Sequence, residues 1–184
     1  DLAGFSVGIV SKKKILNKKK VKKNNLILAI PSNGIHSNGY SLVRSIIKKT
    51  KMTNQLKIEL LKPTKIYTKE IIKLVNKNLI NAAVHITGGG LIENVIRSIP
   101  DNFSANIDLS KIKPLQIFKW LKSKKISDKE MLKTFNCGVG FCIIIDKKNL
   151  KKIKKYFKKD FEPYEIGYIS KNKKKLNLFN SIKW

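Results

Sequence analysis

The feature that most constrains this chain is a turn rich in glycine and asparagine, placed between an apolar run and an amphipathic stretch. Residues 26–30 (Leu-Ile-Leu-Ala-Ile) predict a buried strand, and residues 31–39 (Pro-Ser-Asn-Gly-Ile-His-Ser-Asn-Gly) form the turn. The apolar positions that follow share one face of a helix: Leu42, Val43, Ile46 and Ile47. Glycine lets a backbone approach a ligand closely, and a helix N-terminus offers unpaired N–H groups to an anion. The pattern therefore predicts a ligand-binding strand–turn–helix unit.

A second unit of the same kind lies further along the chain. Residues 82–86 predict a short strand, Thr87-Gly-Gly-Gly90 follows, and a helix is expected from about Leu91. Three consecutive glycines cost backbone entropy when they become ordered, so a plain connection seldom contains them. The helix N-terminus suits a phosphate, and the alternative is a tight turn packed against the sheet. No Gly-Lys-Ser/Thr sequence follows, which excludes a P-loop.

The rest of the chain alternates strand and helix patterns. Strands are expected at residues 103–109, 138–146, 164–170 and 176–179, and helices at residues 115–122, from 127 and from 150. A further helix is expected to begin at Pro63, with a core face made of Ile66, Tyr67, Ile71, Leu74 and Val75. Ser127 and Glu130 form a capping-box pattern. The alternation predicts an α/β (α+β) domain, with one mixed β-sheet and packed helices.

Charge and composition limit the classes of function. The net charge is +28 over 184 residues, yet only Arg44 and Arg97 are arginine among the 40 basic residues. Specific readers of nucleic acid favour arginine, so the lysine excess is interpreted mainly as the codon bias of an A/T-rich genome. No apolar run is long enough to span a bilayer. Cys137 and Cys142 are expected to be reduced thiols, because two cysteines five residues apart on one strand face opposite sides.

Several segments together resemble one known family, the phosphoribosylformylglycinamidine cyclo-ligases, also called aminoimidazole ribonucleotide (AIR) synthetases. The two glycine-rich units carry the resemblance, with Glu93, Asn94 and Arg97 following the triple glycine. Further matches, in the order of the family, are Asp1-Leu-Ala-Gly-Phe5, Pro63-Thr-Lys-Ile-Tyr67, Ile99-Pro-Asp-Asn102 and Thr134-Phe-Asn-Cys-Gly-Val-Gly140. The resemblance covers nearly the whole chain and weakens after about Lys147. The combination of motifs is specific, whereas each motif alone is weak.

The resemblance implies a division into two halves. Residues 1–14 are expected to be the last strand of a first, ATP-binding half together with the start of a linker, and residues 15–184 the C-terminal α/β domain. Residues 12–23 form the charged connector. The first half carries the main ATP-binding and metal-binding residues of the family. Since the chain also lacks an initiator Met, it is expected to be a C-terminal fragment, or a processed or decayed product, that is inactive alone.

The resemblance also implies a reaction. Formylglycinamidine ribonucleotide and ATP give AIR, ADP and phosphate in de novo purine biosynthesis, by transfer of a phosphoryl group to the formyl amide oxygen and closure of the ring through a new C–N bond. The implied cofactors are ATP and Mg²⁺, the full-length form is expected to be a cytoplasmic homodimer, and no membrane or specific nucleic-acid partner is expected. Positioning and charge stabilisation are what such phosphoryl transfer requires.

Candidate site residues come from the two turns. His36 is the candidate catalytic residue, because a histidine can donate, accept or relay a proton near neutral pH, and the alternative is a loop or helix-cap histidine. The candidate substrate-binding residues are Asn33, Gly34, Ser37, Asn38, Thr87, Gly88, Gly89, Gly90, Glu93, Asn94 and Asn136. The glycines are expected to hold the ribose 5-phosphate. No metal ligand is assigned.

Some of these residues have plain structural alternatives. Glu93 is either a general base or metal ligand, or a first-turn acid that complements the helix dipole. Residues 136–140 form either part of the site or a bulge with close backbone packing. Arg97 is expected at the surface, His85 as a satisfied structural histidine, and Cys137 is not expected to be a nucleophile.

Two other classes of function remain open. Related ATP-using enzymes share the architecture: selenophosphate synthetase, thiamine-monophosphate kinase, a hydrogenase-maturation dehydratase and the preceding amidotransferase of the purine pathway. A basic nucleic-acid-binding module would need aromatic residues on an exposed strand platform. Phe118, Trp120, Tyr156 and Phe157 instead fall at helical spacing, which argues against such a module.

Overall fold

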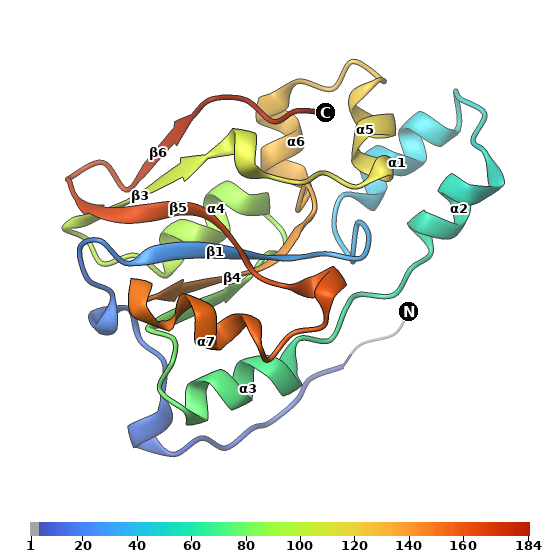
Figure 1. Cartoon of the computed structure of the whole chain (residues 1–184). Coiled ribbons are helices and arrows are strands. Elements are labelled where there is room, and N and C mark those ends of the chain that lie inside the picture. The colour runs from blue at the N-terminus through green and yellow to red at the C-terminus, as the bar shows by residue number, and fades with distance from the viewer. Residues whose placement is uncertain (1–3) are drawn as a thin grey trace.

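A computed structural model describes residues 4–184 and shows one mixed sheet with helices on both faces (Figure 1). Within this part of the chain the strands form a six-stranded sheet in the order β2-β4-β1-β5-β3-β6. The strands are β1 Leu26–Pro31, β2 Ala82–His85, β3 Phe103–Asp108, β4 Val139–Ile145, β5 Tyr164–Lys171 and β6 Leu176–Phe179. Neighbouring strands are antiparallel except β3 and β6, which are parallel. The predicted α/β class with a mixed sheet is confirmed.

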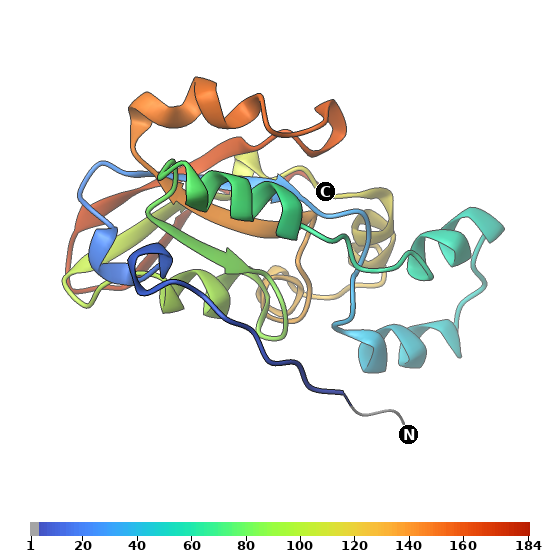
Figure 2. The ribbon, with the colours of Figure 1, turned by 90° about the horizontal axis from the view of Figure 1, so that it is seen from below.

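Helices cover the two faces unequally. They are α1 Tyr40–Ile47, α2 Asn54–Leu60, α3 Thr68–Asn76, α4 Gly90–Arg97, α5 Gln116–Lys122, α6 Asp128–Thr134 and α7 Leu150–Lys154. Buried residues of α1, α2, α4, α5 and α6 share one apolar cluster, whereas α3 and α7 contribute Leu74 and Ile153 to a second. Figure 2 shows α7 and α4 on opposite sides of the sheet.

The central strands are apolar throughout because both of their faces are covered. In β1, Ile27 and Ala29 belong to one cluster, while Leu26, Leu28 and Ile30 belong to the other. Side chains alternate between the faces of a strand, so a strand packed on both faces becomes a continuous apolar run. This pattern explains why residues 26–30 could be identified as a strand.

The helix that was expected to begin at Pro63 begins at Thr68, which corrects the prediction. Residues 63–67 form no regular element before Tyr67, the N-cap of α3, and they are held to the first turn: Asn33 Nδ2 donates to the Pro63 carbonyl at 3.0 Å and the Tyr67 hydroxyl donates to the Pro31 carbonyl at 2.8 Å. Ile66 is therefore 79% exposed rather than part of a core face. Ile47 is also exposed, at the end of α1, and α2 was not predicted.

The segment expected to be a strand at residues 1–11 has no strand within residues 4–11, and residues 1–3 lie outside the described part. Phe5, Val7 and Ile9 are almost fully exposed. A strand requires a neighbour to pair with, and among the described residues none pairs with this segment. The connector contains two short 3₁₀-helices, Lys12–Lys14 and Lys18–Lys20. The division at residues 14 and 15 stays a prediction.

Candidate functional site

The sheet brings the two glycine-rich turns together at one end of its strands. Strands β1 and β2 both run antiparallel to β4, which lies between them, so their carboxyl ends point the same way. The ring centroids of His36 and His85 are 6.2 Å apart. A Cβ atom added to Gly88 would lie 3.6 Å from Asn38 Oδ1. Two motifs that are some 50 residues apart in the sequence therefore form one site.

Asn136 holds the first turn in shape. Its Oδ1 accepts hydrogen bonds from the Ser32 hydroxyl and the Gly138 N–H, both at 2.9 Å. Its Nδ2 donates to the carbonyls of Gly34 at 3.0 Å and Ile35 at 3.1 Å. An asparagine amide has two donor hydrogens and two acceptor lone pairs, so these bonds use its whole capacity. Asn136, a candidate substrate-binding residue, is buried and shapes the turn in this structure.

His36 lies inside the first turn and is only 4% exposed. Its backbone is left-handed, with φ +62°, and its Nε2 lies 3.0 Å from Asn33 Oδ1. An amide oxygen only accepts, so this contact selects the tautomer with hydrogen on Nε2. Among the described residues, the buried Nδ1 has no hydrogen-bond partner. Burial and then His85 lower the pKa of His36 to about 4, which leaves Nδ1 as a free acceptor at neutral pH.

His85 ends β2 in an aromatic cluster. Its ring stacks on Phe141 at 5.6 Å between centroids and meets Tyr67 edge-on at 5.8 Å. Its buried Nε2 has no partner among the described residues, and burial lowers its pKa. The prediction of a satisfied structural histidine is therefore wrong for this nitrogen, because the aromatic neighbours supply no donor to it. His85, Tyr67 and Phe141 also line a pocket that opens beside Thr64 and Lys65.

The second turn is open where the first is closed. Gly88 is exposed, and Gly89 and Gly90 have left-handed backbones with φ +87° and +60°. A side chain at Gly90 would collide with the carbonyl of Leu132 in α6, so this glycine is required by packing. Gly89 is the N-cap of α4, and a side chain there would collide with the side chain of the exposed Glu93.

Asn94 holds the second turn in place by hydrogen bonds from its side-chain amide. Its Nδ2 donates to the carbonyls of Gly90 at 2.7 Å, Gly88 at 3.0 Å and Thr87 at 3.3 Å, and its Oδ1 accepts from the Thr87 hydroxyl at 3.3 Å. These bonds turn the carbonyls of the loop inward, toward the helix. At the N-terminus of α4 the Glu93 side chain lies against Gly89, where its carboxylate complements the partial positive charge of the helix. Asn94, like Asn136, acts here on the shape of the loop.

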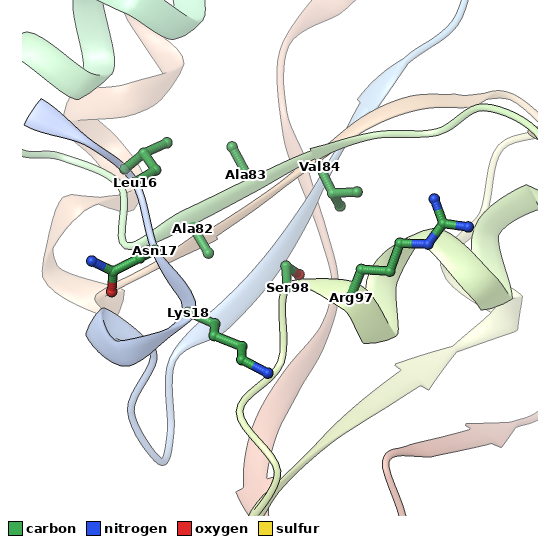
Figure 3. Close-up of a pocket in the computed structure, with 8 residues that line it drawn as sticks. All are labelled: Leu16, Asn17, Lys18, Ala82, Ala83, Val84, Arg97 and Ser98. Atoms are coloured by element: carbon green, nitrogen blue, oxygen red, sulfur yellow. The ribbon is translucent and has the colours of Figure 1, made fainter. Parts of the chain in front are cut away.

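The other candidate residues lie at the rim or away from it. Ser37 Oγ lies 3.0 Å from Thr64 Oγ1, and Gly34 packs beside the carbonyl of Glu59. Arg97, at the end of α4, lines a separate groove beside the outer edge of β2, with Lys18 and Ser98 (Figure 3). Cys137 is buried and its pKa is raised by burial, which agrees with the expectation that it is not a nucleophile.

Two residues of the site were not predicted from the sequence. Tyr67 was placed on a helix core face, yet it contacts both histidines. Gly140 was grouped with a possible bulge, yet a Cβ atom there would collide with the Tyr67 hydroxyl and lie 2.8 Å from His36 Cε1. The Pro63-Thr-Lys-Ile-Tyr67 match was the one signal that could have pointed to Tyr67. Within residues 4–184, no cluster of three or more His, Cys, Asp or Glu residues could hold a metal ion, and no helix is long and apolar enough to cross a membrane.

An α/β domain that gathers two glycine-rich turns at the ends of two strands flanking a third has an arrangement typical of phosphate-binding domains. A family model described as "AIR synthase related protein, C-terminal domain" matches residues 22–177. The chain therefore belongs to the AIR synthase related family and contains its C-terminal domain.

Curated relatives agree with this assignment. The phosphoribosylformylglycinamidine cyclo-ligase of Prochlorococcus marinus (strain MIT 9312) is 46% identical over 181 residues, covering 92% of this chain and 52% of that protein. The enzyme of the same name from Streptococcus agalactiae serotype III (strain NEM316) is 43% identical over 180 residues, covering 93% of this chain and 52% of that protein. The chain thus spans about half the length of the relatives it matches.

Solved structures share the fold at low sequence identity. Thiamine-monophosphate kinase from Stenotrophomonas maltophilia K279a superposes with a TM-score of 0.64 at 16% identity, covering 94% of this chain and 55% of that one. T. maritima PurL complexed with FGAR superposes with a TM-score of 0.55 at 13% identity, covering 91% of this chain and 27% of that one. At these identities the likeness establishes the fold alone.

Proposed function

We propose that this chain is the C-terminal half of an ATP-dependent cyclo-ligase that converts formylglycinamidine ribonucleotide to AIR in purine biosynthesis. The observation that carries the proposal is the meeting of the two glycine-rich turns beside β4, with Asn38 against Gly88 and His36 near His85. Relatives named as this cyclo-ligase, at 46% and 43% identity, support it. The ligase is proposed to be cytoplasmic and homodimeric in its full-length form.

The second turn is proposed to hold the ribose 5-phosphate. The N-terminus of α4 carries a partial positive charge, and the exposed Gly88 leaves room for an oxygen to approach. Thr87 stands at the start of this turn and Asn38 faces it from the first. The net charge of +28 attracts an anionic substrate from solution at low ionic strength.

The first turn is proposed to position the reacting part of the substrate. His36 is the proposed catalytic residue, since its neutral ring with a free Nδ1 can accept a hydrogen bond or a proton from a substrate group. Asn33, Gly34 and Ser37 surround it in the same turn. They are proposed as contacts to the formyl and amidine groups, and Glu93 is proposed to contact the substrate from the second turn.

ATP and Mg²⁺ are proposed cofactors whose main ligands lie outside this chain. T. maritima PurL, which shares the fold, has been solved complexed with ATP, and this supports nucleotide use by the superfamily. The described residues contain no cluster of acidic or histidine ligands suited to a metal ion, so they do not fit an Mg²⁺ site by themselves. We therefore expect the metal to be held by the other half and by the phosphates of ATP.

The test joins this chain to the first half of the Prochlorococcus marinus relative. The joined protein is expected to form AIR from formylglycinamidine ribonucleotide only when ATP and Mg²⁺ are present, and the 184-residue chain alone is expected to form none. Phosphorylation of thiamine monophosphate by the joined protein, without AIR formation, would favour the kinase alternative. AIR formation by the chain alone would contradict the proposed division of labour.

A further inference from the structure

The segment at residues 63–67, which we name the strap, contacts the first turn through three side-chain hydrogen bonds. Asn33 Nδ2 donates to the Pro63 carbonyl at 3.0 Å. Ser37 Oγ lies 3.0 Å from Thr64 Oγ1, and the Tyr67 hydroxyl donates to the Pro31 carbonyl at 2.8 Å. The strap therefore follows the turn from its beginning, at the end of β1, to the residue after His36.

Tyr67 is the buried anchor of the strap. It is 4% exposed, and its ring meets the rings of both His36 and His85 edge-on, at centroid distances of 6.2 and 5.8 Å. Gly140 on β4 leaves the space that Tyr67 and His36 share, because any side chain there would collide with the Tyr67 hydroxyl. The strap and β4 therefore contact His36 from two sides and fix its position.

Asn33 links the strap to the protonation of His36. A side-chain amide presents its nitrogen on one side and its oxygen on the other, so the bond from Nδ2 to the Pro63 carbonyl turns Oδ1 toward His36. Because Oδ1 accepts, the hydrogen of the imidazole must be on Nε2. The nitrogen that remains as an acceptor is then Nδ1, and this choice is made by a carbonyl of the strap.

We infer that the strap is a positioning element that selects the Nε2–H tautomer of His36, with Tyr67 as its anchor and Asn33 as the link. The inference deepens the proposed function, on which it depends for the catalytic role of His36. Tyr67 and Asn33 act on the reaction through the state of the imidazole ring in this scheme. The other titratable groups around the ring are His85, Tyr67 itself and Cys142 close to Tyr67, and burial holds all three neutral at pH 7. The nearest charged group on the strap is Lys65, whose Nζ lies 5.5 Å from the centre of the Tyr67 ring.

The test uses ¹⁵N NMR of the imidazole rings, because the chain has only two histidines and single variants assign them. Wild-type His36 is expected to show one tautomer, with Nδ1 unprotonated, down to a pKa of about 4. Tyr67→Phe removes only the hydroxyl bond to Pro31, and it is expected to give a mixture of tautomers and a pKa closer to the ordinary value of about 6.5. Tyr164→Phe is the matched control, since its hydroxyl accepts from the Lys113 N–H and makes no contact with the first turn.

Asn33→Asp is the second variant, which covers the case in which Tyr67→Phe fails to fold. Aspartate still accepts from Nε2–H but cannot donate to the Pro63 carbonyl, and its charge favours the imidazolium, so a clear rise in the pKa of His36 is expected. In the protein joined to a first half, Tyr67→Phe is expected to lower kcat by at least tenfold with KM changed by less than threefold. An unchanged tautomer and pKa in folded Tyr67→Phe, or an unchanged pKa in Asn33→Asp, would overturn the inference.

The two proposals fail in different ways. If the NMR changes occur but the joined wild-type protein forms no AIR, the strap still controls His36 and the proposed function is wrong. If AIR forms while neither variant alters the His36 ring, the proposed function stands and the inference about the strap is wrong.

Discussion

The two glycine-rich turns have the same local plan, a strand followed by a turn and a helix, but they are built for different uses. The first turn is covered: Asn136 makes three of its four hydrogen bonds to it, the strap contacts it, and His36 is buried within it. The second turn is open: Gly88 is exposed, and its one buried brace, Asn94, turns the carbonyls away from solvent.

The difference teaches how one end of a sheet can supply two kinds of contact. A covered turn fixes a side chain in one position and one protonation state, which suits His36. An open turn presents backbone N–H groups, which suit a phosphate that needs several donors at once. The comparison predicts that the first turn is the more sensitive to loss of internal hydrogen bonds, and the second to loss of backbone freedom.

The largest expected effect is on stability, in the pair Asn136→Ala and Asn94→Ala. Asn136→Ala leaves a hydroxyl, an N–H group and two carbonyls buried without partners, so we expect a loss of about 3–5 kcal/mol in the free energy of unfolding. Asn94→Ala frees carbonyls at a more exposed turn, where water can replace the amide, so about 1–3 kcal/mol is expected. Urea denaturation of the two variants beside wild type measures both values. A larger loss in Asn94→Ala would reverse the comparison.

The next effect is the pH dependence of stability. The pKa of His36 is about 4 in the folded chain and about 6.5 in the unfolded chain, so the unfolded state binds a proton first as the pH falls. The contribution of this group to stability is therefore complete above pH 6.5 and is lost as the pH decreases to about 4, by about 1–3 kcal/mol. His36→Asn, which tolerates the left-handed backbone, is expected to remove most of this loss. Parallel denaturation series at pH 7, 5.5 and 4 measure it, and equal slopes in both proteins would contradict the buried, neutral His36.

The smallest expected effect is the change that variants cause in the affinity for polyanions. This measurement tests whether either turn binds the phosphate groups of any molecule, DNA and RNA included. The structure corrects one sequence-based expectation here, because Tyr168 on β5 and Phe179 on β6 are exposed aromatic residues on strands. We nevertheless expect DNA and RNA to bind by counterion release alone, with affinity falling by about a thousandfold between 50 and 200 mM salt.

Variants separate the candidate sources of such binding. Neither Gly89→Val nor the pair Tyr168→Ala with Phe179→Ala is expected to change the affinity for a single-stranded oligonucleotide more than twofold at fixed salt. Titrations with two unrelated sequences supply the measurement. Strong loss with Gly89→Val would show that the second turn accepts any phosphate, and salt-resistant, sequence-specific binding would favour a nucleic-acid module.

Features set by local sequence could be predicted, and those set by distant contacts could not. The strands at residues 26–30 and 82–86 were predicted from their apolar runs, and only the first of them is buried along its length. The helix cap at Ser127 was predicted because the Ser127 hydroxyl accepts from the Glu130 N–H within one turn. The start of α3 was misplaced by five residues because hydrogen bonds between the strap and residues some 30 positions away, Asn33 and Pro31, hold the strap outside the helix.

The same rule applies to the site. The glycines and His36 were found from their motifs, which are local. The sequence could not predict that the side-chain amides of Asn136 and Asn94 form hydrogen bonds within the turns, because it does not show which way an amide points. Tyr67 was assigned to a helix face because its periodicity fits one, and its contact with His36 depends on how β4 places Gly140.

The most direct test of the central claim, that the second turn holds the substrate phosphate, is the KM of Gly89→Val in the protein joined to a first half. Valine at φ +87° must distort the turn and collide with Glu93, so we expect the KM for the ribonucleotide to rise by about tenfold to a hundredfold, as expected when one charge-assisted hydrogen bond of about 1.5–3 kcal/mol is lost. Lys125→Val, which places the same residue at φ +62° on an exposed loop, controls for backbone strain and is expected to leave KM within twofold. A KM for Gly89→Val equal to that of wild type would contradict the claim.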